Sequence, residues 1–461
     1  RRTARMSVAA SSRRASFPAT NPAQQRVAWR IFEHSTKLPP AMPSTRSNCC
    51  LAACLALLSP QSTIADLGAA LRRSSSVHVP AALPADAPLS GTFVIPLERV
   101  KARSDDAKGA SFYVGKVSVG HPAQPLQVLF DTSSGQVILP HRACKNTACL
   151  EHRSFSPWAS STAMDVNFNG TEVQAGHRLA EGLVTRDGAV VTYMQSDLGE
   201  GEVTAVLVRD SVCMESAGQS TSRACVDLAV LAATKMDDAP FRAMPNDGIV
   251  GLGLANLAVS PMSSFVARLL EGSRNILPQF GIRFGAESGE IHFGAHDSSR
   301  LMSPLRWFPV DHPEDGYWQV AIKAVYVGSN IVDNCERGCH GIVDTGASRL
   351  GVQAGNLPKL EAALTKSLVV MGQQCQGADL KFDLGDMVLT LQASDYTGED
   401  CSPVLGSLAL EEPAFKGVYT FGETVLRRYY AAFDWEQRRL GFAPLVATEE
   451  RNTLVATAVL V

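Results

Sequence analysis

The sequence has no basic surplus and no hydrophobic run long enough to cross a bilayer. Its 42 lysines and arginines are outnumbered by 45 aspartates and glutamates. A general nucleic-acid binder carries a positive surplus to neutralise phosphates, so this balance argues against that class. With 45% hydrophobic and 19% charged residues, a disordered or collagen-like chain is also excluded. The apolar run at residues 49–58 is too short for a membrane span.

Several catalytic and cofactor motifs are missing as well. The sequence contains no His-Glu-x-x-His and no Gly-x-Ser-x-Gly, so metalloprotease and α/β-hydrolase assignments have no support. Gly251 and Gly253 match two glycines of a dinucleotide fingerprint, but Asn256 replaces the third and no βαβ alternation surrounds them. We therefore expect no cofactor and no metal.

The first 65 residues read as a leader outside the fold. Residues 1–64 hold nine basic residues and one acid, Glu33, which leaves 33 basic and 44 acidic residues, a net charge of −11, in the body of the protein. From Met42 the order is a charged start, an apolar run and small residues, as in a secretory signal. The alternative starts at Met6, where Arg- and Ser-rich residues resemble an organelle transit peptide. Both together form a third option, a bipartite leader.

These patterns give an expected division of the chain. It comprises an upstream or leader segment (1–41), a signal peptide (42–65), a short propeptide or N-terminal strand region (66–108), two lobes (109–305 and 306–447) and a tail (448–461). In the third segment, Arg99 or Lys101 either plugs an acidic cleft as part of a propeptide or is simply solvated.

Eight cysteines remain after the three in the leader, and they are spaced as local pairs. If sequence neighbours pair, the bridges are Cys144–Cys149, Cys213–Cys225, Cys335–Cys339 and Cys375–Cys401. This is one of 105 possible connectivities, and it would place the protein in an oxidising compartment. Free buried thiols are the alternative. A zinc site at Cys335, Cys339 and His340 is disfavoured because no second cysteine pair stands at ligand spacing.

The body of the chain is rich in strand patterns. Short period-two runs bounded by Gly and Pro predict strands at residues 112–120, 126–130, 189–193, 202–209, 248–252, 281–284, 290–293, 318–327, 341–344, 387–391 and 431–442. Helical spacing is confined to 262–270, 357–364 and a turn at 424–428. We therefore expect a mostly β protein that is too large for a single sandwich.

An internal repeat organises these strands. Asp131-Thr132 and Asp344-Thr345 each follow an apolar strand, precede a turn of small residues and lie 213 positions apart. Each is followed much later by an apolar-apolar-Gly step, ending at Gly251 and less apolar at Gly422. One copy alone indicates only an Asp that caps a turn, but the pair implies two similar lobes with a cleft between them.

The repeat predicts a specific chemistry. If the two turns meet at a pseudo-twofold axis, Asp131 and Asp344 share a proton, because two adjacent carboxylates cannot both ionise cheaply. The ionised carboxylate then activates a water for attack on a peptide carbonyl, and the protonated one donates toward the carbonyl oxygen. The Thr132 and Thr345 hydroxyls are placed to brace the opposite strand, and small residues such as Gly346 let backbone N–H groups approach the carboxylates.

These residues resemble the pepsin-like aspartic proteases over about residues 93–445. The stretches that carry the likeness are 113–122 before the first Asp, 144–149 after it, Asp-Gly-Ile-Val-Gly-Leu-Gly at 247–253, 335–346 around the second Asp and the closing segment 421–443. The resemblance implies two pseudo-symmetric β-rich lobes, an Asp131–Asp344 catalytic dyad and a hairpin flap. By position the flap tyrosine is Tyr193, for which a plain strand tyrosine is the alternative.

Three departures from the family pattern bear on activity. Ser133 stands where the first motif has glycine, which costs of order 1 kcal/mol if the backbone there is left-handed. Ser134 offers a hydroxyl to Asp131, whereas the equivalent Ala347 offers none to Asp344, so we expect a less acidic pH optimum than that of a stomach-type enzyme. Ile138 replaces a tryptophan that usually bonds the flap tyrosine, so a looser flap is expected.

The sequence therefore favours a monomeric aspartic endopeptidase of the secretory pathway, extracellular or vacuolar and lysosome-like, acting on polypeptides. Organelle targeting through the Arg/Ser-rich leader is the alternative location. Asn169 begins an Asn-Gly-Thr glycosylation signal. The alternative function is a non-catalytic relative that binds peptides or a partner protein. The long stretches between Cys149, Tyr193 and Asp247 are expected to be loops.

Overall fold

The computed structural model describes residues 92–103, 109–174, 186–195, 198–215, 223–272, 276–372, 374–408 and 417–446. All of them belong to one compact unit of the chain. The expected leader, both targeting signals and the tail at 448–461 lie outside the described residues.

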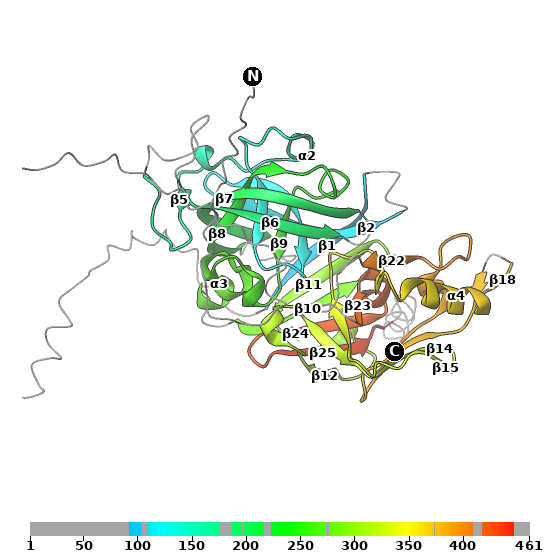
Figure 1. The fold of residues 1–461 in the computed structure, drawn as a ribbon. Helices are drawn as coiled ribbons and strands as arrows, with labels where there is room; N and C mark the ends of the chain where they lie inside the picture. Colours follow the sequence, from blue (N-terminus) through cyan, green and yellow to red (C-terminus); the bar gives the residue numbers. More distant parts are fainter. Residues whose placement is uncertain are drawn as a thin grey trace, which may run out of the picture. The chain divides into compact units, whose positions relative to one another are not determined.

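The described chain is mostly β, as the sequence predicts (Figure 1). Its strands are β1 (Phe93–Lys101), β2 (Ser111–Val119), β3 (Gln124–Asp131), β4 (Val137–Pro140), β5 (Met164–Val166), β6 (Gly188–Gln195), β7 (Gly199–Glu215), β8 (Arg223–Met236), β9 (Gly248–Gly251), β10 (Leu277–Phe284), β11 (Ser288–Gly294), β12 (Arg306–Pro309), β13 (Gln319–Ile322), β14 (Ala324–Val327), β15 (Asn330–Asp333), β16 (Cys339–Val343), β17 (Leu350–Gln353), β18 (Val369–Met371), β19 (Gln374–Gln376), β20 (Leu380–Asp383), β21 (Val388–Leu391), β22 (Leu405–Leu408), β23 (Val418–Phe421), β24 (Tyr429–Asp434) and β25 (Arg439–Pro444). The helices of four residues or more are α2 (Thr147–Leu150), α3 (Phe265–Gly272), α4 (Leu357–Ser367), α5 (Ala393–Tyr396) and α6 (Glu423–Leu426).

One large sheet connects the two lobes. Its strand order is β12-β25-β24-β10-β11-β1-β2-β3-β9-β4-β8-β7-β5, with β6 paired to β7. Strands β12, β24 and β25 come from the second lobe, so they tie that lobe to the first. The second half also forms a separate five-stranded sheet, β13-β16-β23-β17-β22, and a four-stranded sheet, β15-β14-β20-β21. The rings of Phe280, Trp318 and Phe433 pack together across this junction.

The internal repeat is visible in the strand pairing. In the first lobe β3 runs parallel to β9, which pairs antiparallel with β4, which in turn runs parallel to β8. In the second lobe β16, β23, β17 and β22 repeat these three pairings in the same order. The described part of the chain thus has the two-lobed pepsin-like fold expected from the repeat.

The N-terminal strand β1 lies in the segment for which the sequence left a propeptide or a strand region open, although it was not among the predicted strand runs. Its Phe93, Ile95 and Leu97 alternate into the core, and the strand pairs with both β11 and β2. Arg99 is neither a solvated side chain nor a plug. Its Nε donates to Glu423 Oε1 at 2.9 Å, and its Nη2 donates to Ser111 Oγ at 2.8 Å. Arg99 therefore links this strand to α6 of the second lobe.

The stretch after Tyr193 is mostly strand, so the expectation of loops there was wrong. Strands β7 and β8 pair antiparallel over almost their whole length, with β6 on the other edge of β7 (Figure 1). Residues 223–236 contain consecutive small and branched apolar side chains, so they lack the period-two alternation of a half-exposed strand. Such runs are typical of strands buried on both faces.

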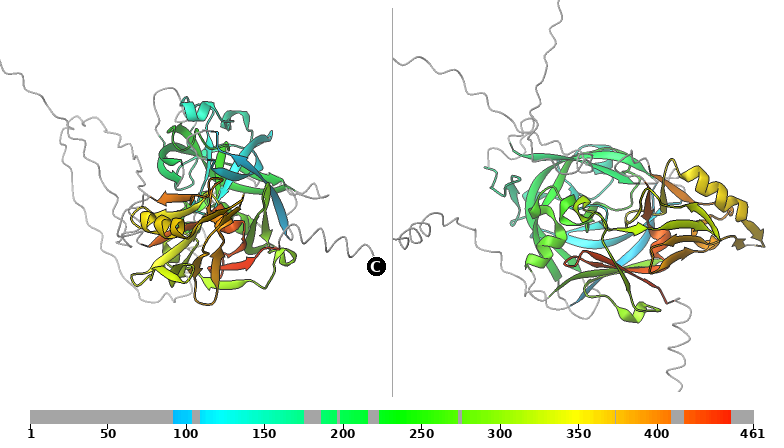
Figure 2. Two further views of the ribbon diagram at one scale, coloured as in Figure 1. Left: turned by 90° about the vertical axis from the view of Figure 1, so that its right-hand side faces the viewer. Right: turned by 60° about the horizontal axis from the view of Figure 1, so that its bottom comes forward.

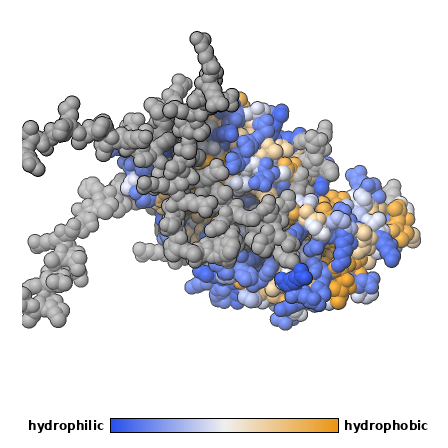
Figure 3. Space-filling view, in the orientation of Figure 1, coloured by the Kyte–Doolittle hydropathy of each residue, from blue (hydrophilic) through white to orange (hydrophobic). Residues whose placement is uncertain are grey.

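The two longest described helices lie in different lobes (Figure 2). Helix α3 packs on β8, and α4 packs beside β15 and β22. The strand that follows α4 exposes Val369, Val370 and Met371, in the region where apolar colour gathers at the right of Figure 3. Within the described ranges, no helix combines the length and apolar character needed to cross a membrane.

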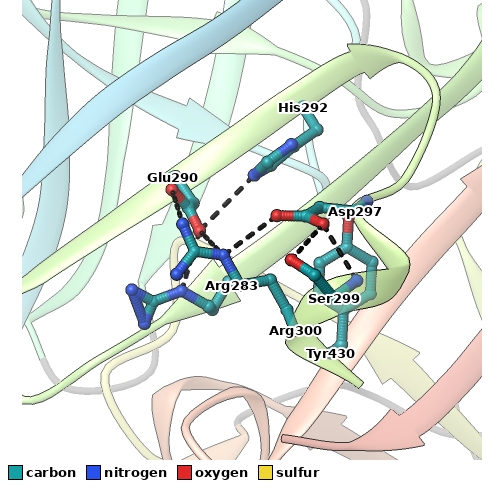
Figure 4. A network of polar contacts seen from close by, with 7 residues as sticks. All are labelled: Arg283, Glu290, His292, Asp297, Ser299, Arg300 and Tyr430. Carbon is teal, nitrogen blue, oxygen red and sulfur yellow. Dashed lines mark hydrogen bonds and ion pairs between the residues drawn. The ribbon is translucent and has the colours of Figure 1, made fainter. Parts of the chain in front are cut away.

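A partly buried ionic network strengthens the large sheet at the lobe junction (Figure 4). Glu290 of β11 accepts from Arg283 Nε at 2.8 Å and from Arg300 Nη2 at 3.3 Å, and His292 Nε2 lies 3.5 Å from its Oε1. The contact with His292 and the two arginines outweigh burial and lower the pKa of Glu290 to about 2. Asp297 accepts from Arg300 Nε at 3.0 Å and extends the network.

This network predicts a pH-dependent stability. Because the folded-state pKa of Glu290 is depressed, its contribution is complete above the unfolded value near 4.5 and is lost as the pH falls toward about 2. Glu290→Gln should lower the free energy of unfolding by about 1–3 kcal/mol at pH 6. Urea denaturation at pH 6 and pH 3 should show that the gap in unfolding free energy between the wild type and Glu290→Gln is smaller at pH 3. A gap of equal size at both pH values would contradict the assignment.

Candidate active site

The two repeated motifs form loops of the same geometry at the ends of β3 and β16. Asp131 is the last residue of β3, and Asp344 directly follows β16. Ser133 N donates to Asp131 Oδ1 at 2.8 Å, and Gly346 N donates to Asp344 Oδ1 at 2.7 Å. Each carboxyl group is therefore held by the turn that follows it.

A reciprocal pair of threonines joins the two loops. Thr132 N donates to Thr345 Oγ1 and Thr345 N donates to Thr132 Oγ1, both at 3.1 Å. The hydroxyl of Thr132 donates to the carbonyl of Val343 at 2.7 Å, and that of Thr345 donates to the carbonyl of Phe130 at 2.6 Å. Both threonines are buried. This is the bracing of opposite strands that the sequence predicts, and it fixes the spacing of the two aspartates.

The two glycines of the repeat allow a second strand to approach each loop. A Cβ on Gly251 would lie 2.6 Å from the carbonyl oxygen of Ser134, and one on Gly422 would lie 2.5 Å from that of Ala347. Ser134 and Ala347 hold equivalent places in the two loops. Any larger side chain would therefore push β9 or β23 away from its loop, which explains the apolar-apolar-Gly steps in the sequence.

The two carboxyl groups lie close together in a poorly hydrated setting. A Cβ on Gly346 would be 3.1 Å from Asp344 Oδ1 and 3.2 Å from Asp131 Oδ1. Asp131 is fully buried and Asp344 is half-buried. Burial first, and then the neighbouring charge of Asp131, raise the pKa of Asp344 to about 8. One proton is therefore retained on the pair through neutral pH.

The serine hydroxyl that donates a hydrogen bond to Asp131 belongs to Ser133 and not to Ser134. Ser133 Oγ donates to Asp131 Oδ1 at 2.7 Å, and it also acts to lower the pKa of Asp344. Ser134 Oγ is buried without a hydrogen-bond partner among the described residues. The expectation that Ser134 serves Asp131 is therefore corrected. Ser133 is also not in the left-handed region, so its Cβ carries no backbone penalty there.

Tyr193 and Gln195 of β6 cover the aspartates. A Cβ on Gly346 would lie 3.3 Å from the Tyr193 hydroxyl, and Gln195 Nε2 donates to the carbonyl of Gly346 at 3.3 Å. Burial, followed by the charges of Asp131 and Asp344, raises the pKa of Tyr193 well above its ordinary value. Tyr193 packs on Phe241 with 5.6 Å between ring centroids. The hairpin of β6 and β7 is thus closed over the dyad. The looser flap expected from Ile138 stays a prediction.

Tyr317 was not identified from the sequence. It lies just before β13, and burial together with the charges of Asp344 and Asp131 raises its pKa to about 12. Its neighbour Trp318 is fully buried and donates from Nε1 to the carbonyl of Leu252 in the other lobe at 2.9 Å. The only sequence signal was the Gly-Tyr-Trp step that opens a predicted strand.

The remaining predicted sites are the paired cysteines and Asn169. Disulfides join Cys144 to Cys149, Cys213 to Cys225, Cys335 to Cys339 and Cys375 to Cys401, which is the pairing of sequence neighbours. Asn169 is exposed, and its Oδ1 accepts from Thr171 N at 3.0 Å and from Thr171 Oγ1 at 2.6 Å. Its glycosylation stays a prediction.

The fold and the paired loops define an aspartic-protease architecture, and comparison with known proteins assigns the family. A family model described as eukaryotic aspartyl protease matches residues 112–197 and 197–445. The chain belongs to this family.

Several members resemble it across most of their length. Cathepsin E of Cavia porcellus is 29% identical over 351 residues, which cover 72% of this chain and 81% of the relative. Cathepsin E of Aquarana catesbeiana is 27% identical over 73% of this chain and 80% of the relative. Pepsin II-1 of Oryctolagus cuniculus is 25% identical over 72% of this chain and 80% of the relative.

The two adjacent serines give a matched test of this geometry. Ser133→Ala removes the hydroxyl bound to Asp131 and retains the backbone donor, so it should raise the pKa values of the carboxyl pair. Ser134→Ala removes a hydroxyl with no described partner and should change little. The measurement is the pH dependence of kcat/KM on a peptide substrate, where only Ser133→Ala should move the acidic limb upward. If Ser134→Ala alone moves it, the hydroxyl assignment is wrong.

Proposed function

We propose that this protein is an aspartic endopeptidase that hydrolyses peptide bonds by a water molecule activated between Asp131 and Asp344. The observation that supports this most directly is the duplicated loop, which places two carboxyl groups around one shared space with one proton retained between them. Membership of the aspartyl proteases favours the same chemistry.

The two aspartates take different roles in the proposed reaction. Asp344 holds the proton, because burial and the adjacent carboxyl raise its pKa to about 8. Asp131, held by two donors from Ser133, is then the base that takes a proton from water. The resulting hydroxide attacks the peptide carbonyl while Asp344 donates toward the carbonyl oxygen. Proton return to the leaving amine completes hydrolysis and restores the pair.

Substrate entry requires the β6–β7 hairpin to move. In the closed state Gln195 Nε2 donates to the carbonyl of Gly346 over a long 3.3 Å bond. A substrate backbone N–H offers the same carbonyl an equivalent donor, so exchange of the bond costs little. We expect the substrate to bind as an extended polypeptide beneath this hairpin, with Tyr193 above the scissile bond.

We place the protein in the secretory pathway, extracellular or in a vacuole-like or lysosome-like compartment. The four disulfides favour an oxidising route, because cytosolic thiols are kept reduced. N-terminal sequencing of the mature protein from cells would distinguish cleavage after the apolar run from transit-peptide cleavage.

The enzyme hypothesis is tested by cleavage of a denatured protein. Asp131→Asn and Asp344→Asn should each reduce the rate by at least about 100-fold, since each removes one half of the acid–base pair. Mass spectrometry of the products of wild-type and variant proteins, prepared identically, provides the measurement. Absence of cleavage by the folded wild-type protein would favour the peptide-binding alternative. Equal cleavage by all three would indicate a contaminating protease.

The raised pKa of Asp344 also predicts the pH profile. Below about pH 8 Asp344 remains protonated, so the singly protonated pair persists through neutrality, and on the alkaline side activity falls as the pH rises through that value. We expect substantial kcat/KM at about pH 6–7, measured with a peptide substrate across pH 2–9 on stable protein. A sharp optimum near pH 2 would contradict this prediction.

A further inference from the structure

Outside the dyad, three metal-ligating side chains converge near the start of β16. Asp311 and His312 follow β12, and His340 is the second residue of β16. His340 Nδ1 lies 2.7 Å from Asp311 Oδ2, and His312 Nε2 lies 3.9 Å from Asp311 Oδ1. One donor atom from each of the three residues falls within 4.8 Å of the others. His340 lies 28 positions after His312 in the sequence, so the fold creates the group.

The cysteines that neighbour His340 in sequence are not part of this group. Cys335 and Cys339 are joined in a disulfide, so neither offers the thiolate that a metal requires. The same fact removes a second set of candidate donors, Asp333 with the two cysteines. His340 instead turns to Asp311 in a different segment of the chain.

A further carboxylate orients the first histidine for metal binding. Glu314 Oε1 lies 3.3 Å from His312 Nδ1. A carboxylate on one ring nitrogen favours the tautomer with its proton there, which leaves the lone pair on Nε2, the nitrogen that faces Asp311. This is the usual outer contact of a metal-bound histidine. His312 also has a left-handed backbone, φ 46° and ψ 57°, which a non-glycine residue adopts at a cost.

The local charge also favours a cation. Asp311, Glu314 and Asp315 stand within five residues of one another, and Asp315 Oδ1 is buried with no hydrogen-bond partner among the described residues. A buried carboxylate oxygen without a partner is costly unless positive charge lies close. A divalent ion bound at Asp311 would add positive charge to this acidic segment.

The donor spacing suits a tetrahedral ion after small shifts. With bonds of about 2.0–2.1 Å, adjacent ligand atoms around zinc are separated by roughly 3.4 Å. The separations from Asp311 are 2.7 Å between its Oδ2 and His340 Nδ1 and 3.9 Å between its Oδ1 and His312 Nε2, on either side of that value. Metal binding would therefore shift these side chains and replace the hydrogen bond between His340 Nδ1 and Asp311. The side chains of Asp311, His312 and His340 are 31%, 52% and 22% exposed, which leaves room for a water as fourth ligand.

We propose that Asp311, His312 and His340 bind a divalent transition-metal ion of the zinc class, with Glu314 orienting His312. The ion is structural, because the loop it holds spans the two lobes. Asn256 Nδ2 donates to the carbonyl of Glu314, and Leu254 N donates to the carbonyl of Gly316, both at 2.9 Å. Metal binding therefore fixes the segment that leads into Tyr317 beside the dyad.

The test is zinc binding by the purified full chain at pH 7.5 after chelator treatment. Calorimetry should give one zinc per chain at micromolar or lower Kd, and zinc should raise the thermal midpoint. His312→Ala and His340→Ala should each weaken binding by at least about 10-fold, with Glu314→Gln, an outer-contact change at a half-exposed residue, weakening it by about 10–100-fold. His121→Ala, at an exposed histidine in another loop, should bind zinc like the wild type.

Two results would overturn the site. One is the absence of both zinc binding and a zinc-dependent rise in thermal midpoint in the wild-type protein. The other is unchanged affinity in His312→Ala and His340→Ala, which would place the ion at different residues. Thermal unfolding without zinc shows whether each variant is folded. If a histidine variant is not folded, the zinc affinity of Glu314→Gln still tests the site. The result is independent of proteolytic activity.

Discussion

The reciprocal hydrogen bonds between Thr132 and Thr345 are the constraint on which the candidate active site depends. Each hydroxyl both accepts from a backbone N–H of the other loop and donates to a backbone carbonyl across the junction. All of these groups are buried and neutral, so breaking one bond would leave unsatisfied polar atoms at about 1–3 kcal/mol each. The frame therefore retains its geometry whatever the charge on the carboxyl groups.

This neutral frame is what allows the pair to share a proton. Two carboxylates held at close range repel, and a flexible support would relax by moving them apart. Because the threonine bonds prevent such movement, the repulsion adds to the effect of burial, which is the larger cause, in raising the pKa of Asp344. The proton is held at Asp344, whereas Ser133 supplies two donors to Asp131. The asymmetry between the motifs, Ser133 against Gly346, thus favours different roles for the two aspartates.

The sequence predicted the parts of this structure that depend on local repetition. The motifs recur with a spacing of 213 residues, and both the aspartates and the strands that follow them, β4 and β17, keep that spacing. Features set by three-dimensional packing were missed. Which of two adjacent serines reaches Asp131 is decided by side-chain direction. Strand β8 has no polar-apolar alternation by which the sequence could distinguish it from a loop. The approach of His340 to Asp311 depends on how two distant segments pack.

The contacts between lobes also indicate where motion must occur. The threonine frame, the bond from Trp318 to Leu252 and the Arg99–Glu423 ion pair all cross the lobe boundary, and the donors or acceptors of each are largely buried. Separating the lobes would break all of them together. Opening the β6–β7 hairpin over the dyad breaks the long hydrogen bond from Gln195 to the carbonyl of Gly346, which a substrate N–H can replace. Access to the aspartates is therefore governed by the hairpin, while the lobes remain fixed and keep the two carboxyl groups in register.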